Sequence, residues 1–160
     1  MSKILAFMLS LLVILLDQGS KYWAMSHLMP YESVACVSMV NWTLAFNSGS
    51  AFNFLSRAGE WHTWLFLSFG ILMSGVLITW IMRLHPQAYL ERWGLGFILG
   101  GALGNIIDRL RFGYVIDFID IFYKNYHWPV FNLADSAICL GGGLLLIDLA
   151  RKQRAMVLDK

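Results

Sequence analysis

Four long apolar stretches dominate the chain, at residues 4–23, 63–82, 93–109 and 131–150, and polar segments separate them. A helix needs about 20 mostly apolar residues to cross about 30 Å of hydrocarbon. The third stretch offers only about 15 apolar residues before Asp108 and Arg109, which places these two charged side chains near a membrane boundary. The pattern therefore predicts an all-α membrane protein with four transmembrane helices.

The flanks of these stretches indicate how the chain lies in the membrane. Lys3 and a short apolar core also suit a cleaved signal peptide, but no small-x-small cleavage site follows before Asp17, which favours an uncleaved first helix. Cytoplasmic flanks carry an excess of Lys and Arg. One side of the predicted bundle holds Lys3, Arg83, Arg92, Arg151, Lys152 and Arg154, whereas the other holds Lys21, Arg57, Arg109, Arg111 and Lys124. This moderate bias places both termini in the cytoplasm and the segments 24–60 and 108–130 outside.

Residues 31–58, between the first two stretches, differ from the rest of the chain. Residues 33–40 and 41–46 are rich in β-favouring side chains, and a turn-like NSGS sequence follows at 47–50. We expect a small extracytoplasmic β-cradle lying on the membrane surface. No repeat, low-complexity tract or linker interrupts the sequence, so residues 1–160 are expected to form a single integral membrane domain.

Composition fits a membrane protein and excludes several function classes. Hydrophobic residues make up 58% and charged residues 14% of the chain, and most of the seven Trp lie near the ends of apolar stretches, where interfacial anchors occur. The formal net charge of +2 comes from scattered Lys and Arg, so no nucleic-acid partner is expected. Cys36 lies in the predicted external loop and Cys139 in an apolar stretch, which argues against a disulfide between them.

Small and polar residues together mark the third stretch. Gly96, Gly100 and Gly104 recur every four residues, a spacing that lets another helix backbone approach closely. We expect this face to pack against another span. Asn105 and Arg109 are also four residues apart, so the packed helix carries a polar end.

Acidic residues inside or beside a span usually mark function or a buried partner, because an Asp at the centre of a span costs about 2.5 kcal/mol or more to insert. Asp148 precedes Arg151 and Lys152 and is expected in an interfacial ion pair. Solvated surface is the expectation for Glu32, Glu60, Glu91, Asp120 and Asp159. Four acids remain, namely Asp17, Asp108, Asp117 and Asp135.

Asp117 and Asp135 are the acids that best suit catalysis. Asp135 lies a few residues into the fourth stretch beside Ser136, and Asn132 can point the same way from three residues before it. Asp117 lies in an external connection that can return it to the start of that stretch. Two carboxylates that share a site hold one proton between them, so one deprotonates a water while the other donates a proton. The spacing fits equally well two unrelated interfacial acids paired with Arg109, Arg111 or Lys124.

Other chemistries have little support in the sequence. Four isolated histidines occur, at His27, His62, His85 and His127, without a His-Glu-x-x-His run or a Cys-x-x-Cys pair, so no metal site is predicted. Serine-nucleophile and phosphate-loop motifs are absent as well, and no cofactor is expected. Peptide hydrolysis by this chain would depend on the carboxylate pair.

Five motifs occur in order across nearly the whole chain: DQGSK (17–21), NSGSAF (47–52), GGALGNIIDR (100–109), VIDF (115–118) and FNLADS (131–136). Together they resemble the lipoprotein signal peptidase family, the type II signal peptidases. The resemblance implies four transmembrane helices with a small external β-cradle in a bacterial cytoplasmic (inner) membrane. It also implies an aspartic endopeptidase that removes signal peptides from prolipoproteins, cleaving before a cysteine that carries diacylglycerol.

The same resemblance implies roles for particular residues. Asp117 and Asp135 correspond to the catalytic dyad, in an active site near the outer leaflet. Supporting or substrate-binding roles are implied for Asn47, Gly49, Asn105, Asp108, Arg109, Asn132 and Ser136. Asp17 and Lys21 resemble a structural pair, and their four-residue spacing favours an ion pair. Gly19 departs from the family pattern, and because Gly lowers helix propensity by about 1 kcal/mol, the first helix is expected to be looser there.

Two other function classes stay open on the residues alone. A proton-coupled transporter subunit would place its carboxylates near the membrane midplane, whereas the candidate acids here gather toward one face. A non-catalytic membrane scaffold would pack through the glycines of the third stretch, but it leaves Asn132 and Asp135 unexplained. The expected partners are diacylglyceryl-modified prolipoproteins and membrane lipid. A monomer is expected, although the sequence does not fix the oligomeric state.

Overall fold

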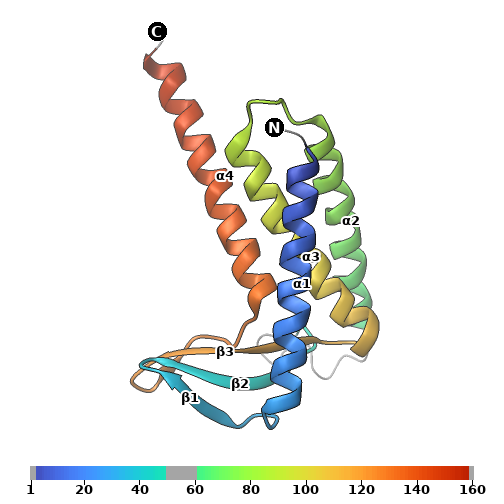
Figure 1. Ribbon diagram of the computed structural model, residues 1–160, viewed down its shortest axis with the longest axis vertical. Coiled ribbons are helices and arrows are strands. Elements are labelled where there is room, and N and C mark those ends of the chain that lie inside the picture. Colours follow the sequence, from blue (N-terminus) through green and yellow to red (C-terminus); the bar gives the residue numbers. More distant parts are fainter. Residues whose placement is uncertain (1–2, 50–60, 159–160) are drawn as a thin grey trace.

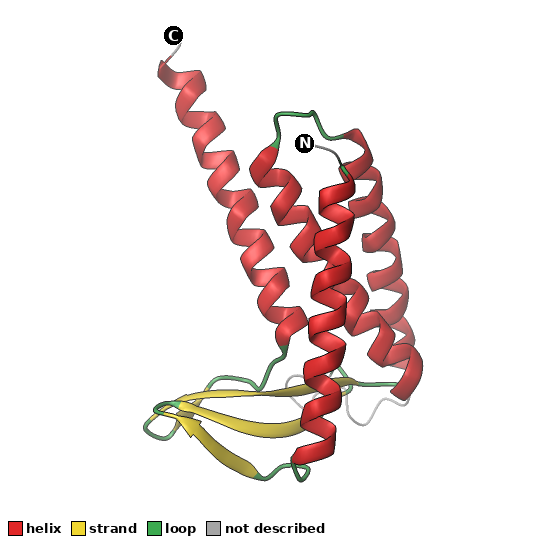
Figure 2. Cartoon of the chain, viewed as in Figure 1, coloured by secondary structure: helices red, strands yellow, loops and turns green. Residues whose placement is uncertain are grey.

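The computed structural model describes residues 3–49 and 61–158, which form a bundle of helices standing on a small sheet (Figure 1 and Figure 2). The helices are α1 (Ile4–His27), α2 (Trp61–Arg83), α3 (Tyr89–Phe112) and α4 (Leu133–Leu158), and the strands are β1 (Ser33–Val37), β2 (Val40–Asn47), β3 (Val115–Tyr123) and β4 (Tyr126–His127). Helix α1 begins and helix α4 ends at the end of the bundle away from the sheet. Residues 50–58 of the expected cradle, with Arg57, and the acids Glu60 and Asp159 lie outside the described residues.

Every helix extends beyond the apolar stretch that predicts it at one end or both, although α4 begins two residues after the start of its stretch. Hydrophobicity marks only the part of a helix that lies in hydrocarbon, whereas charged helix formers such as Arg151 and Lys152 continue α4 into solvent. Helix α1 runs without interruption through Gly19 and ends at His27, shortly before Pro30. Helix α3 ends at Phe112 and is capped by Gly113, whose φ of 80° is the left-handed conformation that often follows a helix C-terminus.

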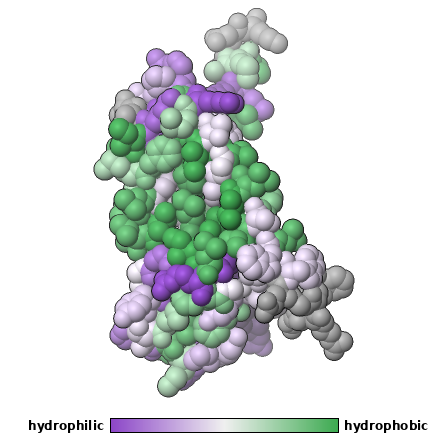
Figure 3. Space-filling view, turned by 90° about the vertical axis from the view of Figure 1, so that its right-hand side faces the viewer, coloured by the Kyte–Doolittle hydropathy of each residue, from purple (hydrophilic) through white to green (hydrophobic). Residues whose placement is uncertain are grey.

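A broad apolar surface covers the helices. Figure 3 shows it between polar residues at the far end of the bundle and polar residues where the helices meet the sheet. Several large side chains on it are more than half exposed, among them Leu15, Phe69, Leu72 and Leu146. Within the described residues, three segments are long and apolar enough to cross a membrane, namely Ile4–His27, Thr63–Arg83 and Leu133–Val157. Helix α3 is not among them, because its glycines and charged ends make it less apolar.

Helix α3 is the centre of the bundle and packs against α1, α2 and α4. The expectation that its glycines face another span is confirmed, since a Cβ on Gly96 would lie 3.0 Å from Ala6 O and one on Gly100 2.8 Å from Ser10 O of α1. A second glycine face, at Gly101, lies directly against the backbone of α4. The four-residue spacing predicts only the first face.

The sheet is antiparallel throughout, with the strand order β1-β2-β3-β4. Strands β1 and β2 lie inside the expected cradle, but β3 and β4 come from the second external segment, where no strand is predicted. The first four residues of β3, from Val115 to Phe118, are all buried, so the strand lacks the apolar–polar alternation typical of a half-exposed sheet. Strand β3 is therefore buried where the sheet meets the bundle.

Two expectations about acidic residues need correction. Asp120 is not on solvated surface, because its side chain on β3 is buried and its carboxylate lies 2.9 Å from His127 Nδ1. His127 is therefore not isolated. Glu91 is only partly exposed, at 17% of its side chain, and it contacts Lys152, which also forms the expected ion pair with Asp148 at 2.7 Å. These contacts join the ends of α3 and α4 that lie away from the sheet. Both cysteines, Cys36 and Cys139, are free and exposed.

Candidate active site

Asp117 and Asp135 meet where the sheet joins the bundle. Asp117 is on β3 and Asp135 is in the first turn of α4. Asn132 lies between them: its Nδ2 donates to Asp117 Oδ1 at 2.7 Å, and its Oδ1 accepts the backbone N–H of Asp135 at 2.9 Å. Asn132 is 0% exposed, so one fully buried amide connects the two acids. The structure thus brings together the residues that the sequence selects as a pair.

The start of α4 holds Asp135 in place. Asn132 is the N-cap, and while its side chain accepts the N–H of Asp135, Asp135 Oδ2 accepts the N–H of Asn132 at 3.3 Å. This reciprocal arrangement is a capping box, with Asn and Asp as its two members. Ser136 Oγ donates to Asn132 O at 2.9 Å, so it closes the turn instead of reaching the acids. The helix N-terminus favours a negative charge on Asp135.

Asp117 is buried on β3 and receives two amide donors. Asn47 Nδ2 on β2 donates to its Oδ2 at 2.9 Å, and Asn132 donates to its other oxygen. Burial raises the pKa of Asp117 to about 7, a rise that the Asn47 hydrogen bond opposes and the nearby charge of Asp135 increases. Near neutral pH, Asp117 therefore holds a proton for much of the time.

The residues 47–49 form a tight turn beside Asp117. The Gly49 N–H donates to Asn47 Oδ1 at 2.8 Å, which leaves the Asn47 amide nitrogen facing Asp117. Gly49 has a φ of 94°, and a Cβ there would lie 2.5 Å from the Phe66 ring of α2. Only glycine fits this position without strain. The turn thereby fixes the orientation of the Asn47 amide.

Two residues of α3 face the acids. Asn105 Nδ2 donates to Asp135 Oδ1 at 2.8 Å. Arg109 is close enough to interact electrostatically with both Asp117 and Asp135, and its guanidinium lies 5.5 Å from the centre of the Phe66 ring. Within the described residues, Arg109 Nε is buried without a hydrogen-bond partner. A positive charge thus lies beside the two acids without forming an ion pair with either.

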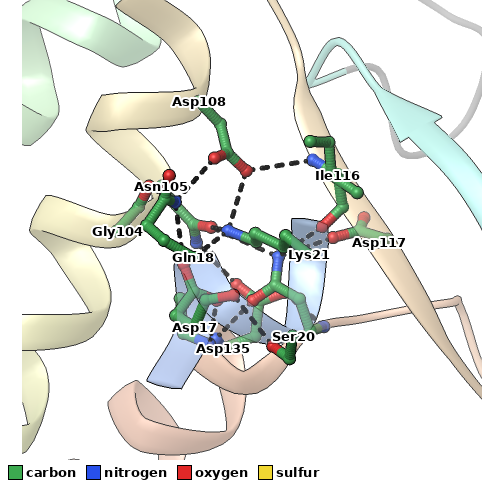
Figure 4. A network of polar contacts seen from close by, with 12 residues as sticks. Asp17, Gln18, Ser20, Lys21, Gly104, Asn105, Asp108, Ile116, Asp117 and Asp135 are labelled. Carbon is green, nitrogen blue, oxygen red and sulfur yellow. Dashed lines mark hydrogen bonds and ion pairs between the residues drawn. The ribbon is translucent and has the colours of Figure 1, made fainter. Parts of the chain in front are cut away.

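Asp17, Lys21 and Asp108 form a buried cluster next to the acids (Figure 4). Lys21 Nζ lies 2.8 Å from an oxygen of each carboxylate, and all three side chains are almost completely buried. Asp17 accepts the Ala134 N–H of α4 at 2.9 Å, and Asp108 accepts the Ile116 N–H of β3 at 3.1 Å. The structure therefore places Asp108 in this ion-pair cluster and not beside Asp135.

One residue that contacts this cluster has no predicted role in the sequence. Gln18 Nε2 donates to Asp108 Oδ1 at 2.8 Å and to Gly104 O at 3.2 Å, and thus ties α1 to α3 (Figure 4). The motif at 17–21 contains Gln18, but its sequence context does not say which partner it reaches. Within residues 3–49 and 61–158, no three His, Cys, Asp or Glu side chains are grouped so that they could hold a metal ion.

Comparisons with known proteins give the chain's relatives. A family model described as signal peptidase (SPase) II matches residues 9–151. The lipoprotein signal peptidase of Acinetobacter baylyi is 48% identical over 148 residues, which cover 91% of this chain and 83% of the relative. That of Pseudoalteromonas atlantica is 42% identical over 145 residues, which cover 91% of this chain and 88% of the relative.

Two solved structures, both described as a bacterial membrane enzyme, have a similar fold at 28% sequence identity. One gives a TM-score of 0.80 and covers 90% of this chain and 91% of that chain. The other gives a TM-score of 0.81 and covers 92% of this chain and 88% of that chain. The similarity thus extends over nearly the whole fold.

Proposed function

The chain belongs to the signal peptidase II family, and on this premise we propose that it is a membrane aspartic endopeptidase that removes signal peptides from prolipoproteins. The single observation that supports the chemistry is the pair Asp117 and Asp135, joined through the buried amide of Asn132. The pair lies at the sheet end of the bundle. A transporter relay would need acids near the middle of the spans, so the peptidase is the function that the geometry favours.

The two acids take different roles in the proposed reaction. Asp135, at a helix N-terminus, is the carboxylate that removes a proton from water. The resulting hydroxide attacks the scissile carbonyl carbon while protonated Asp117 donates to the carbonyl oxygen. When the tetrahedral intermediate collapses, the C–N bond breaks and the leaving amine takes the proton held by Asp135, while the hydroxyl proton returns to Asp117. The positive charge of Arg109 stabilises the negative charge that develops on the carbonyl oxygen.

The supporting residues act on the dyad in several ways. Asn47, Asn105 and Asn132 orient the acids through their side-chain amides, and Gly49 shapes the turn that we expect to contact substrate. Ser136 acts indirectly, because its hydroxyl stabilises the first turn of α4. The ion-pair cluster of Asp17, Lys21 and Asp108 has a structural role that joins α1, α3, α4 and β3. All of these residues act on the position or charge of the dyad.

The membrane arrangement proposed here includes α3 as the fourth span of a single domain over residues 1–160. Helix α3 packs against all three apolar helices, so it lies at the same depth as they do. Lys3 and Arg151 flank the bundle end away from the sheet, and this bias supports the proposal that the termini are cytoplasmic and the sheet is outside. The dyad then lies near the outer leaflet, where a lipid-modified cysteine would hold the scissile bond. We expect the protein to act as a monomer.

The experiment that tests this function is cleavage of a diacylglyceryl-modified prolipoprotein by the purified protein in detergent, with a metal chelator present. The same prolipoprotein without its lipid is the matched control. We expect cleavage of the lipidated substrate alone, at a rate that the chelator does not change. If well-folded protein leaves the lipidated substrate intact, the proposed function is wrong and the transporter and scaffold become the leading alternatives.

A further inference from the structure

Lys21 makes one contact more than an ion-pair role requires. Its Nζ lies 2.8 Å from both Asp17 Oδ2 and Asp108 Oδ2, so these two side chains already provide it with ion-pair partners. The third contact is a hydrogen bond of 3.0 Å that it donates to Asn105 Oδ1 on α3. The Lys21 side chain is only 2% exposed, so water does not compete for this donor. The ammonium thus reaches toward the dyad as well as toward its counterions.

The contact with Lys21 decides which way the Asn105 amide points. The two ends of an amide have nearly the same shape but opposite hydrogen-bonding character. In the observed orientation, Oδ1 accepts from Lys21 Nζ and from Asn132 Nδ2 at 3.2 Å, while Nδ2 donates to Asp135 Oδ1 at 2.8 Å. Rotating the amide by half a turn would oppose a donor to an ammonium and an oxygen to a carboxylate. A protonated Lys21 therefore excludes the rotated form.

The orientation of the Asn105 amide also affects Asp117, through Asn132. Asn132 Nδ2 donates to Asn105 Oδ1 and also to Asp117 Oδ1, at 2.7 Å. If Asn105 were rotated, Asn132 would lose an acceptor and face a donor instead. We infer that Lys21 is a positioning residue for peptide hydrolysis, whose ammonium fixes the Asn105 amide and thereby the hydrogen bonds that hold both Asp135 and Asp117 (Figure 4). This inference rests on the proposed role of the dyad.

The charge of Lys21 also acts on the dyad directly. The charged groups that surround this region are Asp17 from α1, Asp108 and Arg109 from α3, Asp117 from β3 and Asp135 from α4. Among the influences on Asp117, burial and Asp135 raise the pKa, while the positive charge of Lys21 lowers it. Removing that charge therefore moves the pKa of Asp117 further upward, and the basic limb of the pH–rate profile moves with it.

If Lys21 had a purely structural role, its loss would have the same effect on kcat as the loss of Gln18, which contacts the same cluster. Gln18 joins α1 to α3 in the same cluster, through Asp108 and Gly104 O, but no hydrogen bond connects it to Asn105 or to the dyad acids. Gln18→Leu therefore removes packing and hydrogen bonds from the cluster and leaves the orientation of the Asn105 amide unchanged. We expect it to lower the unfolding temperature and to change kcat by less than about twofold.

The test variant is the double substitution Asp17→Asn with Lys21→Met, which removes one charge of each sign and leaves the net charge of the cluster unchanged. The oxygen of the new amide can still accept the Ala134 N–H. We expect kcat to fall by about 100-fold with KM nearly unchanged, because misplaced catalytic groups cost rates of this order. The basic limb should also move to higher pH. A folded double variant with the parent kcat and pH profile would overturn the inference, and so would an equal loss of kcat in Gln18→Leu.

Asn105→Ala keeps the inference testable if the double variant does not fold, because it leaves all charges of the cluster in place. It removes the hydrogen bonds of the Asn105 side chain to Lys21, Asn132 and Asp135, and the same fall in kcat is expected. A parent-like kcat in Asn105→Ala would refute the link whatever happens to the double variant. Asp135→Asn tests the catalytic dyad separately from the role of Lys21. If Asp135→Asn is active, the dyad itself is wrong, whereas if it is inactive and Asn105→Ala is not, only the role of Lys21 is wrong.

Discussion

Asn47→Ala should extend peptidase activity to higher pH. Asn47 Nδ2 donates to Asp117 Oδ2 at 2.9 Å, and this hydrogen bond favours the ionised form of Asp117. Without it, the pKa of Asp117 rises above its value of about 7. The proton on Asp117 is the one that the scissile carbonyl oxygen receives, so activity is lost as the pH increases through this pKa. A higher pKa therefore keeps the enzyme active at a higher pH.

The size of this shift follows from the strength of the hydrogen bond. Hydrogen bonds to charged groups contribute about 1.5–3 kcal/mol. Because Asn47 is only half-buried, water replaces part of its contribution, and about 1.4 kcal/mol is a suitable value. That energy corresponds to about one pH unit. We expect the basic limb of kcat/KM near pH 7 in the parent and about one unit higher in Asn47→Ala.

The assay is the pH dependence of kcat/KM for a lipidated reporter peptide in detergent, between about pH 5 and pH 9. The ratio kcat/KM is measured because its pH dependence reports the pKa values of catalytic groups in the free enzyme. Thr43→Val is the matched control, because Thr43 lies on the same strand but donates to Asp120 Oδ2, at 3.4 Å. Its basic limb should match the parent's. A limb in Asn47→Ala that stays in place or moves to lower pH would refute this account of Asp117, as would an equal shift in Thr43→Val.

Two further predictions concern packing and surface charge. Gly101→Ala should lower stability by about 1–3 kcal/mol, measured as unfolding temperature in detergent, because the new methyl would meet the Ala134 backbone of α4. Gly142→Ala, where nothing lies within 4 Å, should unfold at nearly the parent temperature, and similar losses in both would contradict the packing argument. Asp148→Asn should cleave at the parent rate, because its partner Lys152 lies at the end of α4 away from the dyad. A loss of cleavage rate comparable to that of a dyad variant would show that the active site is not at Asp117 and Asp135.

Apolar stretches in the sequence locate the helices because hydrocarbon imposes a length and a composition on whatever crosses it. The helix ends are not predicted, since residues such as Arg151 and Lys152 continue α4 beyond the apolar stretch. Strand β3 is not predicted either, because burial on both faces removes the alternation from which a strand is recognised. The burial of Asp120 is not predicted for the same reason, since it depends on the pairing of β3 with β2 and β4.

The candidate site shows the same division between local and long-range information. The four-residue spacing of Asp17 and Lys21 predicts their ion pair, because both lie on one face of a single helix. The contact of Lys21 with Asn105 joins residues 84 positions apart, and it depends on how closely α1 packs against the glycines of α3. The capping box of Asn132 and Asp135 is local. It is not recognised from the sequence because this motif usually contains Ser or Thr with Glu or Gln.

The most direct test of the central claim is the cleavage rate of Asp117→Asn and Asp135→Asn on the lipidated prolipoprotein. Asp120→Asn is the control, because Asp120 is on the same strand as Asp117 and is buried to a similar extent, at 3% against 2% exposed, but has no proposed part in the reaction. We expect both dyad variants to fold and to lose at least about 10³-fold in kcat, since each lacks one acid–base group, while Asp120→Asn remains active. Cleavage near the parent rate by either folded dyad variant would contradict the assignment of Asp117 and Asp135 as the catalytic pair.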